Sequence, residues 1–414
     1  MFLKVEPFQL LFIDIDTFSE DYCEEIWKTL ANSVKLVFFT VDVTNPKIQN
    51  LHLYGEVCHF FGFSNIFAFI DNNNLMVEIL NSFNIKSDQA AVVTKSIDSL
   101  DYLTGLNIRN ILVSGQGDFE HAPDFLCRSS RDLIEVTQNI LGTYFAENFF
   151  LNHPCPKSML LKKVLKSDNA YINVFAGGRY YKKNCCQSQY HFLSNKIISN
   201  KTDGKENPLF YPLYKKMIKT CWMNPSNNTI IVSVPPQPGK INRFKRLVEN
   251  LSRFFGFIDG SDYIICPLNY GNNKSRNAVE RAKSLQGVFC LNPELNSNPF
   301  IGKNVIIIDD IVASGATISE IGSLLLNNNA NNINAFVMGI NQKNNFWENY
   351  SPLLCPNCNV PMILRMRNRD SKPFFGCQNY FSNGCTQTIS FDNGMLKLKA
   401  LNNLKVIEED PFEF

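Results

Sequence analysis

The segment Asn304–Leu326, NVIIIDDIVASGATISEIGSLLL, carries the strongest structural signal in this chain. Its continuous apolar run, Val305–Ile308, predicts a β-strand buried on both faces, which is typical of a parallel sheet. The amphipathic run Ile318–Leu326 predicts a helix directly afterwards. Asp309 and Asp310 stand at the carboxyl end of the strand, where open α/β sheets bind ligands. The segment therefore predicts an α/β fold with a ligand site between this strand and this helix.

The turn between the strand and the helix consists of small residues and predicts a phosphate site. Backbone N–H groups and hydroxyls of such a turn can surround a phosphate, and the helix dipole favours the anion. Paired acids beside the turn can bind ribose hydroxyls and a divalent cation together. The turn residues, called the phosphate loop below, are Ala313, Ser314, Gly315, Ala316 and Thr317.

This arrangement resembles the signature of the type I phosphoribosyltransferases, in which an apolar strand, two acids and two spacer residues precede a Thr-Thr-Gly-x-Thr-like loop. The resemblance implies that Asp309 and Asp310 are the catalytic pair and hold the ribose hydroxyls of phosphoribosyl pyrophosphate (PRPP), with Mg²⁺ as cofactor. It also implies that the phosphate loop holds the 5′-phosphate. Ala313 stands where the family more often has Thr, so one hydroxyl ligand is missing while the backbone amides remain. A buried strand with a capped helix alone would not explain the acids.

A second segment, IIVSVPPQPGKINRFKRLVENL, predicts a strand at 230–234, a Pro-rich loop at 235–240 and then a basic helix. It resembles the pyrophosphate loop of the amidophosphoribosyltransferase and competence-protein branch. The resemblance implies that Lys240, Arg243 and Arg246 meet the pyrophosphate, a role for which Arg is suited by its bidentate contacts. The alternative is a Pro-rich turn before a solvated basic helix.

The segment Asn269–Phe289 carries basic residues shortly before the main motif. In the same branch a basic loop at this position closes over the pyrophosphate and excludes water, which implies binding roles for Lys274 and Arg276. A solvated helix face is the alternative. Tyr171–Asn184 is a candidate part of the hood that selects the acceptor.

Two series of strand and helix patterns organise the chain. From Phe8 to Leu141, short apolar runs alternate with helix-length segments, which predicts βα units and a parallel sheet. A second series follows the punctuation at 152–156, with IIVSV, DYIICPL, NVIIIDD and INAFVMGI as its clearest strands. The predicted fold class is α/β, with two Rossmann-like parallel sheets and a small C-terminal zinc ribbon. The predicted domains are 1–145, 152–346 and 352–396.

In the first series, LLFIDIDTF places Asp14 and Asp16 at a strand end, and Thr40 ends the next strand. This resembles the haloacid dehalogenase-like fold, which implies a nucleophile, an acid/base and a phosphate-binding residue in that order. Lys95 stands where the fourth motif of that fold would supply a magnesium ligand, so we expect weak phosphatase activity. Either Lys86 or Lys95 would bind phosphate. The alternative is an unspecialised Rossmann-like layer whose acids cap the strand.

Four cysteines near the C-terminus form C-x₂-C, eighteen intervening residues and C-x₇-C. Four thiolates in two knuckles match a tetrahedral structural zinc site, and the ligands would be Cys355, Cys358, Cys377 and Cys385. The segment resembles the C-terminal zinc ribbons of bacterial type IA topoisomerases.

Cations and aromatic residues alternate between the two knuckles. Such a pattern suits single-stranded nucleic acid, because bases stack on rings while cations follow the backbone. The alternative is that the rings form the small core of the ribbon. The net charge of +2 gives the whole chain no strong field, so any nucleic-acid surface is local. The candidate contacts are Arg365, Arg367, Arg369, Lys372, Phe374 and Phe375.

No apolar run reaches the ~20 residues that a membrane span needs, and the N-terminal residues lack a signal-peptide pattern. The thirteen cysteines are an odd number scattered through a long chain, which favours reduced thiols and a cytoplasmic protein. The leading prediction is a PRPP-dependent transferase acting on or near nucleic acid or a nucleoprotein. Fusions of the two α/β folds resemble bacterial stress-response and phage-defence components, which suggests antiviral defence. The alternatives are a non-catalytic, nucleotide-sensing regulator and a phosphatase.

Overall fold

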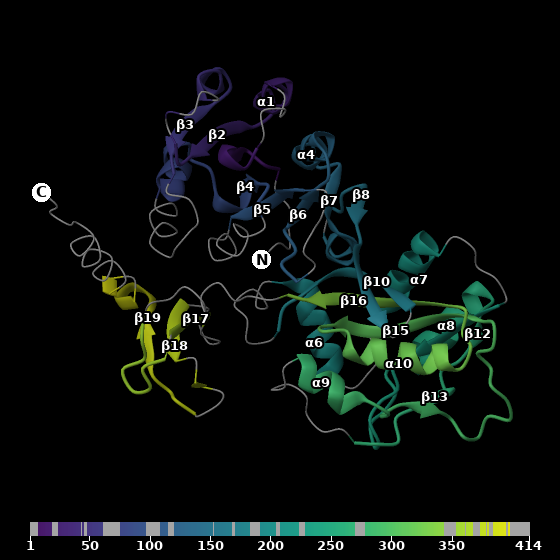
Figure 1. The fold of residues 1–414 in the computed structure, drawn as a ribbon. Helices are drawn as coiled ribbons and strands as arrows, with labels where there is room; N and C mark the ends of the chain where they lie inside the picture. Colours follow the sequence, from purple (N-terminus) through teal and green to yellow (C-terminus); the bar gives the residue numbers. More distant parts are fainter. Residues whose placement is uncertain are drawn as a thin grey trace, which may run out of the picture.

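The computed structural model shows two parallel β-sheets and a small C-terminal antiparallel sheet (Figure 1). This confirms the predicted α/β fold class. No helix among the described residues is long and apolar enough to cross a membrane. The structure describes residues 7–18, 24–42, 44, 48–60, 75–96, 108–114, 120–151, 153–167, 170–182, 191–203, 208–222, 228–269, 278–342, 353–360, 362–366, 373–377, 379–380, 384–394 and 396–397.

The N-terminal sheet has the strand order β3-β2-β1-β4-β5-β6, and all its neighbouring strands pair in parallel. Strands β1, β4 and β5 are buried at every position and are apolar over most of their length, as expected for a sheet covered on both faces. Helices α1 and α4 pack on one face, and residues 75–82 pack on the other. The elements are β1 (Leu10–Asp14), η1 (Ile15–Thr17), α1 (Glu24–Ala31), β2 (Lys35–Thr40), η3 (Leu51–Leu53), β3 (Glu56–His59), η4 (Ser87–Gln89), β4 (Ala90–Thr94), β5 (Arg109–Val113), β6 (Phe125–Cys127) and α4 (Ser130–Thr137).

The second sheet has the order β12-β11-β15-β16-β10-β9, and β9 alone is antiparallel to its neighbour. Alternate residues of its central strands enter two cores, so that α9 and α10 cover one face while α6, α7 and α8 cover the other. The elements are β9 (Leu161–Ser167), β10 (Ala170–Tyr180), α6 (Phe192–Asp203), α7 (Phe210–Cys221), β11 (Thr229–Ser233), α8 (Lys245–Phe255), β12 (Ile258–Asp259), α9 (Ala278–Leu285), β15 (Asn304–Val312), α10 (Ala316–Asn327) and β16 (Asn332–Asn341).

Three details of this second sheet differ from the sequence predictions. The acids lie inside β15, because Ile311 and Val312 beyond them still pair with β16. DYIICPL does not add a parallel strand: only Ile264–Ile265 (β13) is extended, and it pairs antiparallel with Cys290–Leu291 (β14). Most of the predicted hood segment is β10, which pairs in parallel with β16 and is part of the main sheet.

Between the two large sheets lie β7 (Leu141–Tyr144), α5 (Phe145–Phe149) and β8 (Lys157–Met159). The predicted boundary at 145–152 falls between β7 and β8, which pair with each other in parallel. The C-terminal sheet consists of β17 (Met362–Met366), β18 (Pro373–Cys377) and β19 (Thr388–Ser390), shown in yellow in Figure 1.

Candidate functional site at the end of β15

The acid pair on β15 is held by its own backbone and by helix α7. The Asp310 N–H donates to Asp309 Oδ1 at 2.8 Å, and the buried Tyr214 hydroxyl of α7 donates to the Asp309 carbonyl oxygen at 2.5 Å. Asp309 is half-buried, whereas Asp310 is only 4% exposed. The Asp309 carboxyl group and the backbone beside it are therefore held by groups that a ligand does not need to displace.

Two cations meet Asp310. Lys201 Nζ of α6 lies 3.2 Å from Asp310 Oδ1, and an Arg243 Nη2 hydrogen bond reaches Asp310 Oδ2 at 3.0 Å. Arg243 also donates to the Asn200 side chain at 2.9 Å, so α6 holds both cations over the acid. The predicted pyrophosphate ligand Arg243 is thus beside the acid pair, engaged by Asp310.

Asp309 differs electrostatically from an exposed carboxylate. Burial, and then the neighbouring Asp310 charge, raise the pKa of Asp309 from 3.8 to about 7, although Lys201 and Arg243 lower it. Close to neutral pH this carboxyl group is therefore partly protonated, and a cation or cationic side chain at the site favours the ionised form.

The phosphate loop begins helix α10. Gly315 is the N-cap with φ +87°, a conformation that L side chains rarely adopt, and a Cβ there would lie 2.5 Å from Leu165 Cδ2 of β9. Ser314 Oγ accepts from the Ala316 N–H at 3.4 Å, while Ser314, Ala316 and Thr317 remain partly exposed. The geometry suits an anion at the helix N-terminus.

The other basic candidates are distributed unevenly. Arg243 and Arg246 line one open groove of about 490 Å³ at the start of α8. Lys240 is exposed, does not line that groove, and its Nζ lies 3.3 Å from the Gln237 side-chain oxygen. Lys274 and Arg276 lie outside the described residues, so their predicted role stays a prediction.

The N-terminal acids stand at the end of β1, and the threonines that end the adjoining strands β4 and β2 contact them. Asp14 accepts from Thr94 at 2.9 Å, and Asp16 accepts from Thr40 at 2.7 Å and from the Val41 N–H at 2.7 Å. Burial raises the pKa of Asp14 to about 6, the Thr94 bond lowers it and the Asp16 charge raises it. The Thr40 hydroxyl, predicted to bind phosphate, is thus engaged by Asp16.

Lys95, the other predicted residue of that site, follows β4. Its backbone N–H donates to Thr17 Oγ1 at 3.0 Å, and its Nζ lies 5.0 Å from the centroid of the Phe18 ring. The catalytic roles inferred for this region remain predictions.

The four C-terminal cysteines converge. The Sγ atoms of Cys355, Cys358, Cys377 and Cys385 all lie within 4.8 Å of one another, and Cys355 and Cys385 are 3.7 Å apart. A tetrahedral zinc ion with bonds of about 2.3 Å would place its thiolates about 3.8 Å apart. The cluster therefore fits such an ion.

The predicted aromatic contacts of this region need a correction. Phe375 is fully buried and stacks on Phe391 with ring centroids 6.1 Å apart, so it belongs to the ribbon core and does not present a face for bases. Phe374 is half-buried. Arg365 lies on β17, its side chain outside the described residues, and Arg367, Arg369 and Lys372 also lie outside them.

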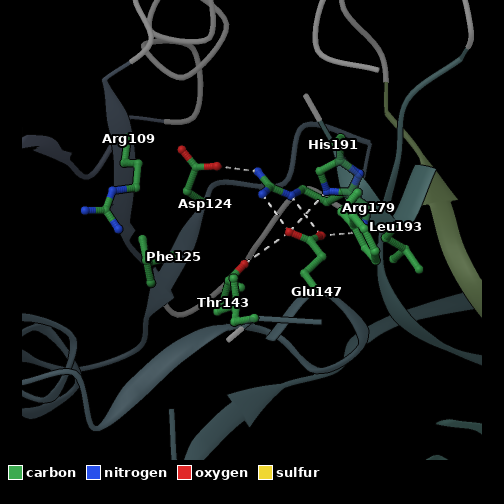
Figure 2. A pocket seen from close by; sticks show the side chains of 10 residues that line it. Arg109, Asp124, Phe125, Thr143, Glu147, Arg179, His191 and Leu193 are labelled. Carbon is green, nitrogen blue, oxygen red and sulfur yellow. Dashed lines mark hydrogen bonds and ion pairs between the residues drawn. The ribbon is translucent and has the colours of Figure 1, made fainter. Parts of the chain in front are cut away.

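A buried ionic cluster joins the two large sheets (Figure 2). Arg179 of β10, 3% exposed, donates from Nε and Nη2 to Glu147 at 3.1 and 2.8 Å and from Nη1 to Asp124 at 2.8 Å. Thr143 donates to Glu147 at 3.2 Å, and His191 Nε2 lies 3.3 Å from Glu147 Oε2. Burial raises the pKa of Glu147, but Arg179 and His191 outweigh it and hold that pKa well below its usual range.

This cluster lines a small cavity of about 30 Å³, room for little more than one water molecule. One of its acids, Asp124, also accepts from the Asn110 N–H of β5 in the N-terminal sheet at 2.9 Å. The other, Glu147, lies on α5. We interpret the cluster as a structural link between β5, α5 and β10.

Several functional candidates were missed by sequence reasoning. Lys201 and Asn200 lie on α6, which carries no recognisable motif, and Tyr214 reads as an ordinary core residue of α7. Lys163 of β9 reads as an exposed lysine of an edge strand, yet its Nζ lies 3.4 Å from the carbonyl oxygen of Ala313. In each case the partner is distant in the sequence, so local pattern gave no signal.

Comparison with known proteins gives one family match, which lies within the second α/β unit. Residues 205–346 match the family model of the phosphoribosyl transferase domain. No curated protein matches the chain. Among solved structures, a hypothetical protein from Xanthomonas campestris is 12% identical, with a TM-score of 0.24, covering 32% of this chain and 83% of that one. A phosphoribosylpyrophosphate synthetase from Mycobacterium smegmatis is 11% identical, with a TM-score of 0.24, covering 80% of this chain and 81% of that one.

Proposed function

We propose that this chain is a phosphoribosyltransferase that binds PRPP with Mg²⁺ and transfers the phosphoribosyl group to an acceptor nucleophile. The observation that carries the proposal is that one sheet edge brings together the Asp309–Asp310 pair, the cations Lys201 and Arg243, and the phosphate loop. The phosphoribosyltransferase domain match over residues 205–346 supports the same assignment.

In this proposal each group has a defined task. Asp309 and Asp310 bind the ribose hydroxyls, and the phosphate loop binds the 5′-phosphate. Carboxylate oxygens are hard donors that suit Mg²⁺, which would neutralise charge on the pyrophosphate when bound. The polyanionic substrate would draw Arg243 away from Asp310. Arg243 and Arg246 would then both face the pyrophosphate leaving group.

The reaction forms a bond from the acceptor nucleophile to the anomeric carbon and breaks the bond from that carbon to pyrophosphate. Pyrophosphate leaves with the electron pair, and the transition state resembles an oxocarbenium ion. Catalysis in this scheme is mainly electrostatic, because the cations stabilise charge that develops on the leaving group.

The test is calorimetric titration of the full chain with PRPP in the presence of Mg²⁺, followed by an assay of pyrophosphate release with candidate acceptors. We expect saturable PRPP binding and steady release with one acceptor class. Absence of PRPP binding would contradict the proposal. Binding without turnover for any acceptor would favour the alternative, a nucleotide-sensing regulator.

The four-cysteine cluster has a supporting role in the proposal. Cys355, Cys358, Cys377 and Cys385 would hold a structural zinc ion that stabilises a module with little apolar core. Metal analysis should give about one zinc per chain and less in Cys355→Ser. Equal zinc in both proteins would remove the claim.

A further part of the proposal is that the C-terminal ribbon brings the enzyme to single-stranded nucleic acid or to a nucleoprotein. Nucleic-acid binding would depend on the basic residues between β17 and β18. Phe375 is buried, so its ring is not available to stack on a base. Fluorescence anisotropy with a labelled single-stranded oligonucleotide tests it, with Arg367→Ala and Arg369→Ala as variants. The defence role stays a prediction that no described residue addresses.

The remaining proposals concern the domain division and the N-terminal site. We keep 1–145, 152–346 and 352–396 as the proposed domains, in a cytoplasmic protein. For the haloacid dehalogenase-like site we expect weak hydrolysis of phosphate esters with Mg²⁺, because Lys95 stands where a magnesium-binding acid would be expected and the Thr40 hydroxyl already donates to Asp16. Vigorous hydrolysis abolished by Asp14→Asn would show that this site is a working phosphatase.

A further inference from the structure

Lys163 occupies the core-facing side of strand β9. Side chains alternate along a strand, so Lys163 shares a face with Leu161 and Leu165, which are 3% and 7% exposed. Its own side chain is 18% exposed. Its neighbour Lys162 points the other way and is exposed. Lysine is rarely buried without a partner, so this position calls for an anionic or polar group on the inner side of the strand.

The inner side of β9 lies against the phosphate loop. Lys163 Nζ is 3.4 Å from the Ala313 carbonyl oxygen, at the first residue of the loop. Leu165, the next residue on the same face, is the side chain that a Cβ on Gly315 would strike. Two successive inward residues of β9 therefore reach the two ends of the Ala313–Gly315 turn.

The second partner of Lys163 is a carboxylate from the N-terminal half of the chain. Glu120 Oε1 lies 3.1 Å from Lys163 Nζ. Two contacts fix the segment 120–124 at this place: the Ala122 N–H donates to the Gln342 side chain at 2.8 Å, and Asp124 pairs with Arg179. The Lys163 ammonium group therefore has Glu120 as its counter-ion. If another anion replaced Glu120, the charge of the ammonium group would still be neutralised.

We propose that Lys163 binds the 5′-phosphate of PRPP and that this phosphate displaces Glu120 from the ammonium group. The proposal rests on the proposed function. An ammonium group carries three donors, and lysine binds phosphate as a compact point charge. Ala313 lacks the hydroxyl that a Thr would present to the phosphate, and Lys163 reaches the same residue of the loop from β9. The lysine supplies charge where the loop lacks a hydrogen-bond donor.

The first experiment compares Lys163→Met with its matched control Lys162→Met in the full chain. Calorimetry measures the affinity for ribose 5-phosphate, which carries only this phosphate, and for magnesium pyrophosphate, which lacks it. We expect Lys163→Met to weaken ribose 5-phosphate binding by about tenfold or more, the usual cost of a lost charge-assisted contact. Pyrophosphate affinity should not change, and Lys162→Met should change neither. Equal ribose 5-phosphate affinity in Lys163→Met and the parent chain would overturn the proposal.

The second experiment uses the sign of the effect of Glu120→Gln. If the phosphate competes with Glu120 for Lys163, neutralising Glu120 should raise ribose 5-phosphate affinity a few-fold. If Lys163 only braces the loop through Glu120, the same change should lower that affinity. Lys163→Arg keeps the charge and should retain most of the binding. Because Glu120→Gln leaves the lysine in place, this test stands even where Lys163→Met does not fold.

The outcomes separate this proposal from the proposed function. A parent chain that binds neither PRPP nor ribose 5-phosphate contradicts the transferase assignment and this inference with it. A parent chain that binds both, with unchanged affinity in Lys163→Met or lowered affinity in Glu120→Gln, contradicts only the role of Lys163.

Discussion

Each of the two large sheets presents a pair of aspartates toward the carboxyl end of one strand, but the partners of the two pairs differ. In the N-terminal sheet, Asp14 and Asp16 accept hydrogen bonds from Thr94, Thr40 and a backbone N–H, groups that belong to the sheet edge itself. In the second sheet, Asp310 meets long cationic side chains from α6 and from the residues before α8. Fixed hydroxyls satisfy a carboxylate permanently, whereas long cations can turn toward an arriving phosphate. The comparison therefore favours the second sheet as the ligand site.

The sharpest way to break this comparison is to neutralise each pair in turn. The Asp309→Asn/Asp310→Asn double variant should lose about one to two decades of PRPP affinity, because losing charge-assisted contacts costs about 1.5–3 kcal/mol. The Asp14→Asn/Asp16→Asn variant should leave that affinity unchanged. Calorimetry with Mg²⁺ measures both, and circular dichroism checks the fold. Unchanged affinity in the first variant would mean that the β15 acids are scaffold.

The next effect concerns the phosphate loop. Gly315→Ala should weaken PRPP binding by about tenfold, because a Cβ at φ +87° is strained and meets Leu165, moving the amides that face the phosphate. Gly302→Ala is the matched control, since Gly302 also has positive φ (+66°) but open space around its Cβ position. We expect the control to reduce stability only. Equal binding losses in both variants would assign the effect to strain in general.

A smaller effect should appear in the pH dependence of PRPP affinity. The raised pKa of Asp309 means that its carboxylate form, which the site needs, becomes dominant only above about pH 7. Affinity should therefore rise from pH 5.5 to about 7 and then level off, beyond the ionisation of PRPP itself. The Asp309→Asn variant, titrated in parallel, should lack this component. The same slope in both proteins would exclude Asp309 as its source.

The smallest expected effect is on stability, and it should have the same sign for Asp309 and for Asp14. A carboxyl group whose pKa is raised on folding destabilises the native state as pH rises from the unfolded pKa of 3.8 toward about 7 for Asp309 or about 6 for Asp14. Single Asn variants at either position should thus raise the free energy of unfolding at pH 8 by about 1 kcal/mol. Asp310→Asn should lower it, because Lys201 and Arg243 lose their partner. Urea denaturation measures all three, and destabilisation by Asp309→Asn would contradict the burial argument.

The local part of this site could be predicted from sequence. Strand, acids, turn and helix are contiguous in Asn304–Leu326. The hydrophobic run predicts the strand, the small residues predict the turn, and the helical spacing of apolar residues predicts the helix. The extension of β15 to Val312 was not predicted, because it depends on pairing with Ile340 of β16. DYIICPL was assigned to the parallel sheet because a short apolar run gives no information on its partner strand.

The long-range part could not be predicted. Lys163 and Ala313 are 150 residues apart, and Asp124 and Arg179 meet across a boundary that composition marks only by Pro and Asn. Charged residues within strands also read as exposed, so Arg179 and Lys163 gave no sign of burial. What sequence patterns miss here is the set of groups that a helix or strand brings to the site from another part of the chain.

The buried contacts of Arg179 limit where the chain can be cut to separate the second sheet from the N-terminal sheet. A fragment confined to residues 205–346 would keep the acids and the phosphate loop but would lose β10, exposing one edge of β16. A fragment that begins at 152 would recover β10 but bring a buried guanidinium without Asp124 and Glu147, and a buried charge that loses its partners is strongly destabilising. The smallest stable unit around the second sheet therefore includes Asp124 and Glu147, and a truncation or gene fusion that cuts the chain between these residues and β10 should destabilise it.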